Sequence, residues 1–377
     1  MKHRFCCIFI ITLLTWSILF STSVLAEDSG SVHHYASALM EAESGTLLDG
    51  RDSDVRLPVG SLTKLMTVYL TAEAVETGRF TLDTELSAPP SAQEQSGAVI
   101  WLVSGEQMSV QDLLKGVIIG NANDAAVTLA LQIAGSVSEF VGEMNAAAFS
   151  LGMKNTRFTD CTGRSDENIS TAHEIALLCR ALLDYEWLTP IFTTWREFLR
   201  DGKTELVSEN TLTRTYEGIL GLKAGHGDAS GYTLAAAAER NGMRCITVIL
   251  GCDDESERFT YGKKLLAHGF SDFYVTTPSF STEFLRPVTV AHGMSQSVNI
   301  RTDALLSIAA PLGAELTSIV VLPEYTEAPV RIGQQLGIVG IYCDDCLLYE
   351  VPLCADEEIP RRNFRNSFAV LLENLFK

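Results

Sequence analysis

Three short segments carry residue types that together could activate a serine hydroxyl. Ser61 and Lys64 stand three residues apart where helical spacing begins after Pro58, so both side chains fall on one face of the first turn. A serine is a weak nucleophile until a neighbouring base takes its proton. A lysine can be that base when burial or another cation lowers its pKa. The pair alone is a weak signal, because Ser-x-x-Lys arises by chance in many helices.

Two further segments follow in chain order. Asn121 and Asn123 form a polar cluster between two apolar helical runs. The third segment precedes a β-hairpin and consists of Lys223, Ala224, Gly225 and His226. Ser-x-x-Lys, Ser-x-Asn and Lys-Thr-Gly, in this order, form the motif set shared by penicillin-binding proteins and class A β-lactamases. The three segments therefore predict acyl transfer through a serine.

The chain resembles the serine-type D-Ala-D-Ala carboxypeptidases, which are low-molecular-mass penicillin-binding proteins of the peptidase S11 family. The stretches that carry the resemblance are 59–67, 155–158, 162–163 and 218–232, with 328–330 and 333–334 farther along the chain. The resemblance implies removal of the terminal D-alanine from peptidoglycan stem peptides ending in D-Ala-D-Ala. It also implies β-lactam antibiotics as covalent inhibitors. We expect neither a cofactor nor a metal.

The same resemblance implies a role for each segment. Ser61 would form the acyl-enzyme and Lys64 would be its base, while Asn123 would orient the substrate amide. Lys223 would bind the terminal carboxylate, and the backbone N–H groups of Ser61 and His226 would hold the oxyanion. The implied catalytic residues are Ser61, Lys64, Asn121 and Asn123, and the implied substrate-binding residues are Lys223, Ala224, Gly225 and His226.

Two positions depart from the family pattern. Asn121 stands where the second motif usually has serine, and an amide cannot relay a proton to the leaving amine. Ala224 stands where the third motif usually has threonine or serine, so one hydroxyl contact to the substrate carboxylate is missing. A lost general acid costs roughly 10²–10⁴-fold, whereas a hydrogen bond to a charged group contributes roughly 1.5–3 kcal/mol. Asn121 is the graver departure, and the sequence predicts an active enzyme that is slowed.

Other functions stay open at this point. A catalytically impaired penicillin-binding homologue with a wall-binding or regulatory role would fit Asn121 and Ala224. A β-lactamase is less expected, because the sequence contains no convincing motif for a deacylating glutamate. A structural adhesin would need neither Ser61 nor Lys64.

The elements that must position these residues follow from the sequence pattern. A hairpin is predicted over 35–48, helices over 110–152, and two strands over 233–238 and 244–251. The Asn-Gly pair at 241–242 is a strong hairpin signal between those strands. A helix is predicted over 257–268, and short alternating runs from 288 to 352, separated by Gly and Pro, predict a small all-β domain.

Together with the resemblance, these elements predict the fold class. It is an α/β (α+β) β-lactamase/transpeptidase-like domain with an antiparallel sheet and a helical insertion, followed by a small all-β domain and a C-terminal amphipathic helix. We expect a signal peptide over 1–26, the catalytic domain over 33–275, the β domain over 280–356 and the helix over 360–377.

Composition and the two ends of the chain bear on location. Residues 1–26 have a basic start, an apolar run and a small-residue cleavage pattern, which predicts export. Their removal takes away two positive charges and lowers the net charge from −19 to −21. This acidic balance, without a basic stripe, argues against nucleic acid as a partner. Seven cysteines follow residue 26, and their pairing is left open.

The last segment combines an apolar stripe with a basic start. Its large apolar residues fall at helical spacings: Phe364, Phe368, Leu371, Leu372, Leu375 and Phe376. Such a helix can lie in a membrane interface. We therefore expect a protein that is exported, peripheral on the outer face of the cytoplasmic membrane and facing the cell wall.

Overall fold

The computed structural model describes residues 35–279, 285–302 and 305–368. The predicted signal peptide lies outside these residues, and so does the end of the predicted C-terminal helix, residues 369–377.

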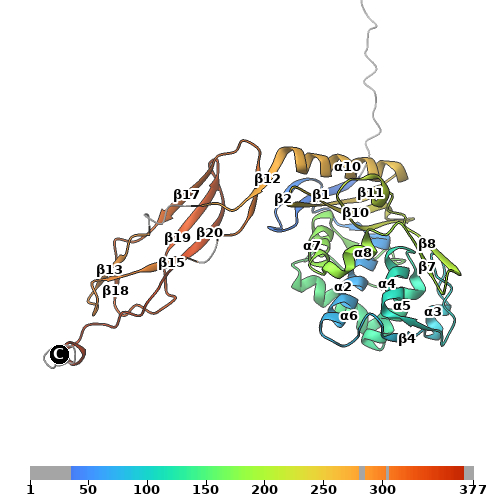
Figure 1. The fold of residues 1–377 in the computed structure, drawn as a ribbon, viewed down its shortest axis with the longest axis horizontal. Helices are drawn as coiled ribbons and strands as arrows, with labels where there is room; N and C mark the ends of the chain where they lie inside the picture. Colours follow the sequence, from blue (N-terminus) through green and yellow to red (C-terminus); the bar gives the residue numbers. More distant parts are fainter. Residues whose placement is uncertain (1–34, 280–284, 303–304, 369–377) are drawn as a thin grey trace, which may run out of the picture.

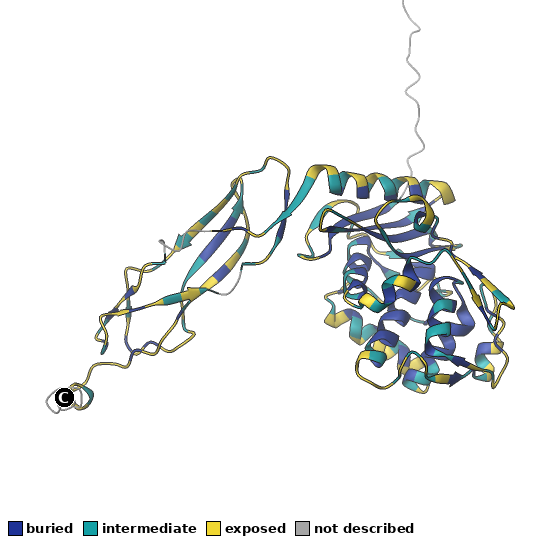
Figure 2. Cartoon of the chain, in the orientation of Figure 1, coloured by how far each residue is buried: buried dark blue, intermediate teal, exposed yellow. Residues whose placement is uncertain are grey.

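A five-stranded antiparallel sheet forms the centre of the first part of the molecule (Figure 1). Its strand order is β2-β1-β11-β10-β9. The strands are β1 (Ala36–Glu41), β2 (Leu47–Arg51), β9 (Ile219–Gly227), β10 (Gly231–Arg240) and β11 (Met243–Cys252). All of β1 and most of β10 and β11 are buried, which means that both faces of the sheet are covered (Figure 2).

Both hairpins predicted from turn residues are present. β1 pairs with β2, and β10 pairs with β11 so that Arg240 lies opposite Met243. Asn241 and Gly242 connect these two residues with φ angles of 52° and 79°. A two-residue turn of this kind needs positive φ at both positions, which asparagine and glycine tolerate.

Helices cover the two faces of this sheet (Figure 1). α10 (Glu255–Asp272) packs on one face, and α7 (Ala172–Leu183) packs on the other, against β1 and β11. α2 (Lys64–Glu76) runs through the helical layer in contact with α7, α4 (Val110–Ile118), α5 (Asn123–Ala134) and α6 (Val137–Ser150). The predicted helical region over 110–152 is thus confirmed, as is the helix predicted over 257–268.

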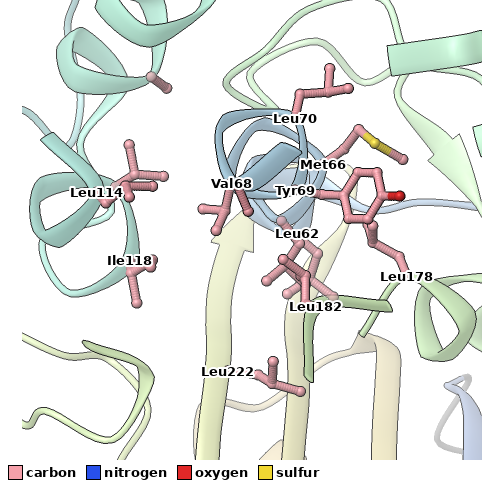
Figure 3. Packing of buried hydrophobic residues seen from close by; sticks show 14 of the residues in the cluster. Leu62, Met66, Val68, Tyr69, Leu70, Leu114, Ile118, Leu178, Leu182 and Leu222 are labelled. Carbon is pink, nitrogen blue, oxygen red and sulfur yellow. The ribbon is translucent and has the colours of Figure 1, made fainter. Parts of the chain in front are cut away.

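The core of this layer explains why α2 shows no polar face. Ten of its 13 residues are buried, which is typical of a helix surrounded by other elements. Figure 3 shows Met66, Val68 and Leu70 of α2 between Leu114 of α4 and Leu178 of α7. This packing fixes the start of α2.

Short elements complete the first part. Three two-stranded ladders are formed by β3 (Leu57–Pro58) with β6 (Ile169–Ser170), β4 (Glu85–Ser87) with β5 (Gln107–Ser109), and β7 (Arg196–Leu199) with β8 (Thr204–Val207). The short helices are η1 (Gly60–Thr63), η2 (Glu186–Leu188), α3 (Pro90–Gln93), α8 (Thr189–Phe192) and α9 (Leu212–Thr215).

The second part of the molecule is built from strands, as predicted (Figure 1). Its three sheets have the strand orders β12-β16, β14-β13-β18 and β15-β20-β19-β17. The strands are β12 (Phe273–Thr276), β13 (Val288–Ala291), β14 (Ser297–Val298), β15 (Ile300–Thr302), β16 (Ile308–Pro311), β17 (Leu316–Val321), β18 (Tyr325–Glu327), β19 (Gln335–Cys343) and β20 (Cys346–Ala355). Their buried cluster includes Val339, Ile341 and Leu353.

A helix that spans a bilayer needs about 20 mostly apolar residues. Within the described ranges, no single helix is long and apolar enough to cross a bilayer, although the bent pair of α5 and α6 meets the same criteria together. Nine of the 12 residues of α5 are buried in the protein.

Candidate active site

Ser61 lies in η1, the tight turn that leads into α2. Its side chain retains 8% exposure, while that of Lys64, one turn later, retains 2%. Neighbouring apolar side chains, Leu62 and Leu65, are fully buried and anchor this turn in the core. The spacing of three therefore brings hydroxyl and amine to one cavity, as the sequence predicts.

Lys64 is held at the floor of this cavity. Its Nζ donates a hydrogen bond to the backbone oxygen of Thr162 at 2.6 Å. Burial is the main cause that lowers the pKa of Lys64 to about 7; the charge of Lys223 contributes to this shift, and Asp160 opposes it. A lysine with this pKa is neutral in a large fraction of molecules near pH 7, and a neutral amine can accept the serine proton.

The second segment connects α4 to α5. Asn121 adopts a φ of 56°, a left-handed conformation that asparagine tolerates better than most residues. Its Nδ2 lies 3.3 Å from the Oγ of Ser61. Asn123 donates from Nδ2 to the oxygen of Ser96 at 2.8 Å. In the part of the chain that the structure describes, the buried Oδ1 atoms of Asn121 and Asn123 have no hydrogen-bond partner.

The third segment lies on β9, where side chains alternate between the two faces. Lys223 points its Nζ to the oxygen of Val117 at 3.4 Å. Burial lowers its pKa to about 8, with Glu209 opposing the shift and Arg258 adding to it. Ala224 packs on the opposite face, in a hydrophobic cluster that includes Leu234.

Gly225 lies directly against Ser61. A Cβ atom at Gly225 would come within 2.5 Å of the Cβ of Ser61. Only glycine permits this approach of the strand to the serine. The backbone oxygen of Gly225 accepts a hydrogen bond of 2.5 Å from the buried guanidinium of Arg258.

These elements enclose a cavity of about 500 Å³. Of the residues predicted from the sequence, its lining contains Ser61, Lys64, Asn121, Asn123 and His226. Gly225 lies next to Ser61 but is not part of the lining, and neither is the buried Lys223. The side chain of Ala224, by contrast, points away from the cavity into a hydrophobic cluster.

Three further residues shape the site without standing in a motif. The Asp160 carboxylate accepts hydrogen bonds from the backbone N–H groups of Thr162 and Gly163, both at 2.6 Å. Arg258 is buried against β9, where it donates to the backbone oxygen of Gly225. Glu209 lines the cavity and accepts a hydrogen bond from Asn121 at 3.2 Å. Glu209 and Arg258 lie far from Ser61 in the sequence, so the sequence alone gives no indication that they are near it.

Comparison with known proteins shows similarity over most of the chain. A family model described as D-alanyl-D-alanine carboxypeptidase matches residues 23–254. D-alanyl-D-alanine carboxypeptidase DacF of Bacillus subtilis is 33% identical, with 92% of each chain covered. DacA of Escherichia coli is 31% identical, covering 86% of this chain and 83% of the relative.

Solved structures show the same similarity in three dimensions. Penicillin binding protein 5 from Haemophilus influenzae has a TM-score of 0.78 and 29% identity, covering 86% of this chain and 97% of that one. Penicillin-binding protein D2 from Listeria monocytogenes, in its ampicillin-bound form, has a TM-score of 0.57 and 30% identity, covering 63% and 97%.

Proposed function

Because the chain belongs to the D-alanyl-D-alanine carboxypeptidase family, we propose that Ser61 attacks the peptide bond between the two D-alanines of a peptidoglycan stem peptide. The enzyme is a serine hydrolase of this type. The assignment of its residues rests above all on one observation. Ser61 and a lysine whose pKa is lowered to about 7 line the same cavity.

In the first half of the reaction, Lys64 takes the proton of Ser61 while Oγ bonds to the carbonyl carbon. The negative charge that forms on the carbonyl oxygen would be held by the backbone N–H groups of Ser61 and His226. The carbon–nitrogen bond then breaks, and the leaving amine takes the proton from Lys64. Free D-alanine departs, and the shortened peptide stays bound to Ser61 as an ester.

In the second half, water attacks the ester. Lys64 accepts a proton from the water and returns it to the oxygen of Ser61 as the ester bond breaks. The shortened peptide leaves with the new carboxylate, and the enzyme is restored. In this scheme Asn123 orients the substrate amide and Lys223 provides the positive charge for the terminal carboxylate, with the peptide chain entering along β9.

A labelling experiment tests this assignment. Intact-mass analysis after exposure to a penicillin should show one covalent adduct, and the adduct should be absent in Ser61→Ala. An adduct that persists in this variant would overturn the assignment of the nucleophile. An impaired penicillin-binding homologue, which Asn121 favours, would form the adduct yet release no D-alanine from a stem peptide.

The same proposal covers organisation and location. Residues 33–275 form the catalytic domain and residues 280–356 the β domain, after a signal peptide over 1–26. The protein acts outside the cytoplasm and is held on the outer face of the membrane by the helix over 360–377. The exposed side chains at its described start support this: Phe364 is 85% exposed and stacks on Phe368.

A further inference from the structure

The amide of Asn121 bridges two groups on opposite sides. Its Nδ2 lies 3.3 Å from Oγ of Ser61 and 3.2 Å from Oε1 of Glu209. Glu209 stands between β8 and α9, and its side chain is exposed at the cavity. The backbone there is fixed, since Asn210 is 1% exposed and bonds through Nδ2 to Gly221.

We propose that Glu209 is a positioning residue for the nucleophile, acting through Asn121. A carboxylate offers only acceptors, so the nitrogen of the Asn121 amide must face it. With that side fixed, the same nitrogen donates to Ser61, and Oδ1 stays buried without a hydrogen-bond partner among the described residues. Asn121 and Glu209 together thus take the place of the serine that is usual in the family.

This arrangement has a defined effect on the reaction, given the roles proposed above for Ser61 and Lys64. A hydrogen bond donated to Oγ occupies one lone pair and stabilises negative charge as the serine loses its proton. Asn121 transfers no proton itself, so the proton taken by Lys64 passes directly to the leaving amine. Without Glu209, the amide can rotate and present its oxygen to Ser61, which would repel the developing charge.

Glu209 also adds negative charge beside two buried lysines. The ionisable groups whose charges shift the pKa of Lys64 are Lys223, Asp160, Cys161 and Glu209. The groups whose charges shift the pKa of Lys223 are Glu209 and Arg258. In both cases Glu209 raises the pKa against the effect of burial. Loss of its charge should therefore lower the pKa of both lysines.

The experiment compares variants of the full mature chain in penicillin acylation and D-alanine release across pH. Glu209→Ala removes acceptor and charge, and Glu209→Gln removes only the charge. Each is made alone and with Asn121→Ser, and Glu217→Ala is the control for a lost exposed carboxylate outside the cavity lining.

The expected results separate the effect of the hydrogen bond to Asn121 from the effect of the negative charge of Glu209. Glu209→Ala should slow acylation of Ser61 about tenfold at its own pH optimum, the range of one hydrogen bond to a charged group. Glu209→Gln should retain a larger fraction of the wild-type acylation rate than Glu209→Ala does. Both should shift the two limbs of the pH profile to lower pH. In the Asn121→Ser background, Glu209→Ala should change the optimal rate by less than about twofold, as expected when two residues act as one unit.

Two results would overturn the proposal. One is a wild-type rate in Glu209→Ala, and the other is an equal loss in both backgrounds, which would mean that the carboxylate acts only as a charge. Failure of the wider assignment looks different, because labelling would then persist in Ser61→Ala whatever stands at position 209.

Discussion

The two site lysines have similar surroundings, but the proposed mechanism requires them in opposite charge states. Both are buried, and burial is the largest cause of the lowered pKa of each. In that mechanism Lys64 is neutral when it accepts a proton, whereas Lys223 stays charged to bind a carboxylate. The charge on Lys223 itself helps to keep Lys64 neutral.

These opposite requirements predict a narrow bell-shaped dependence of kcat/KM on pH. Activity should rise as pH passes about 7, where Lys64 loses its proton, and fall above about 8, where Lys223 loses its own. The two limbs describe the interacting pair and not each lysine alone. D-alanine release from a peptide substrate, measured from pH 5 to pH 10, checks this. A flat profile through this range would contradict the roles of both lysines.

Individual site residues differed in how far the sequence predicts them. Ser61 and Lys64 could be paired because helical geometry sets their positions over three residues. Glu209 could not be placed, since it reaches Asn121 only through the packing of the segment after β8. The direction of the Ala224 side chain depends in turn on which face of β9 meets the cavity.

Among the elements, the loop after α6 has the clearest part in shaping the site. Its residue Thr162 provides the oxygen that binds Lys64, and Asp160 holds that residue in place. The side chain of Asp160 is partly buried and organises this loop. Its carboxylate accepts bonds from Thr162, Gly163, Ser165 and Asn168.

Asp160→Ala should destabilise the protein and disturb the position of Lys64. Several backbone N–H groups would lose their acceptor, at a cost of roughly 2–4 kcal/mol in the free energy of unfolding. Urea unfolding measures this, with Asp166→Ala, an exposed carboxylate of the same loop, as the control. Unchanged stability of Asp160→Ala would contradict the structural role of this loop.

The same carboxylate predicts a dependence of stability on pH. Burial opposes ionisation of Asp160, but hydrogen bonds from Ser165, Thr162 and Gly163 lower its pKa overall. A group whose pKa is lower in the folded state stabilises the fold above its unfolded pKa. This contribution is therefore lost as pH falls through the folded pKa, and Asp160→Ala should reduce the acid sensitivity of unfolding.

Element prediction succeeded where a pattern is long or a turn is specific. The helices over 110–152 have sustained apolar spacing, and the Asn241-Gly242 pair defines its hairpin by backbone conformation alone. The ladder of β3 with β6 is only two residues long in each strand. Such a pair has no period to detect, and it exists because Leu57 and Ser170 meet in the folded chain.

At the scale of the whole molecule, the part that holds the cavity and the strand-rich part follow one another along the chain, and Figure 1 shows them side by side, with the last described residues at the far tip of the second. This places the start of the C-terminal helix well away from the cavity. A surface contact there can form without blocking the site.

Deletion of residues 360–377 should separate binding to membranes from catalysis. Burial of each large apolar side chain contributes roughly 1.5–3 kcal/mol, before ordering is discounted. The mature protein should therefore sediment with anionic liposomes, and the truncated form should stay in the supernatant while Ser61 is still labelled by penicillin. Salt should weaken the binding through Arg361, Arg362 and Arg365. Equal sedimentation of both forms would mean that the segment does not anchor the protein.

Release of D-alanine from a stem peptide ending in D-Ala-D-Ala tests the central claim most directly. We predict steady turnover by the mature wild-type protein and a fall to the uncatalysed background in Ser61→Ala, with unchanged thermal unfolding of the variant. Release by Ser61→Ala at a rate close to that of the wild type would contradict the claim that this serine carries the acyl group.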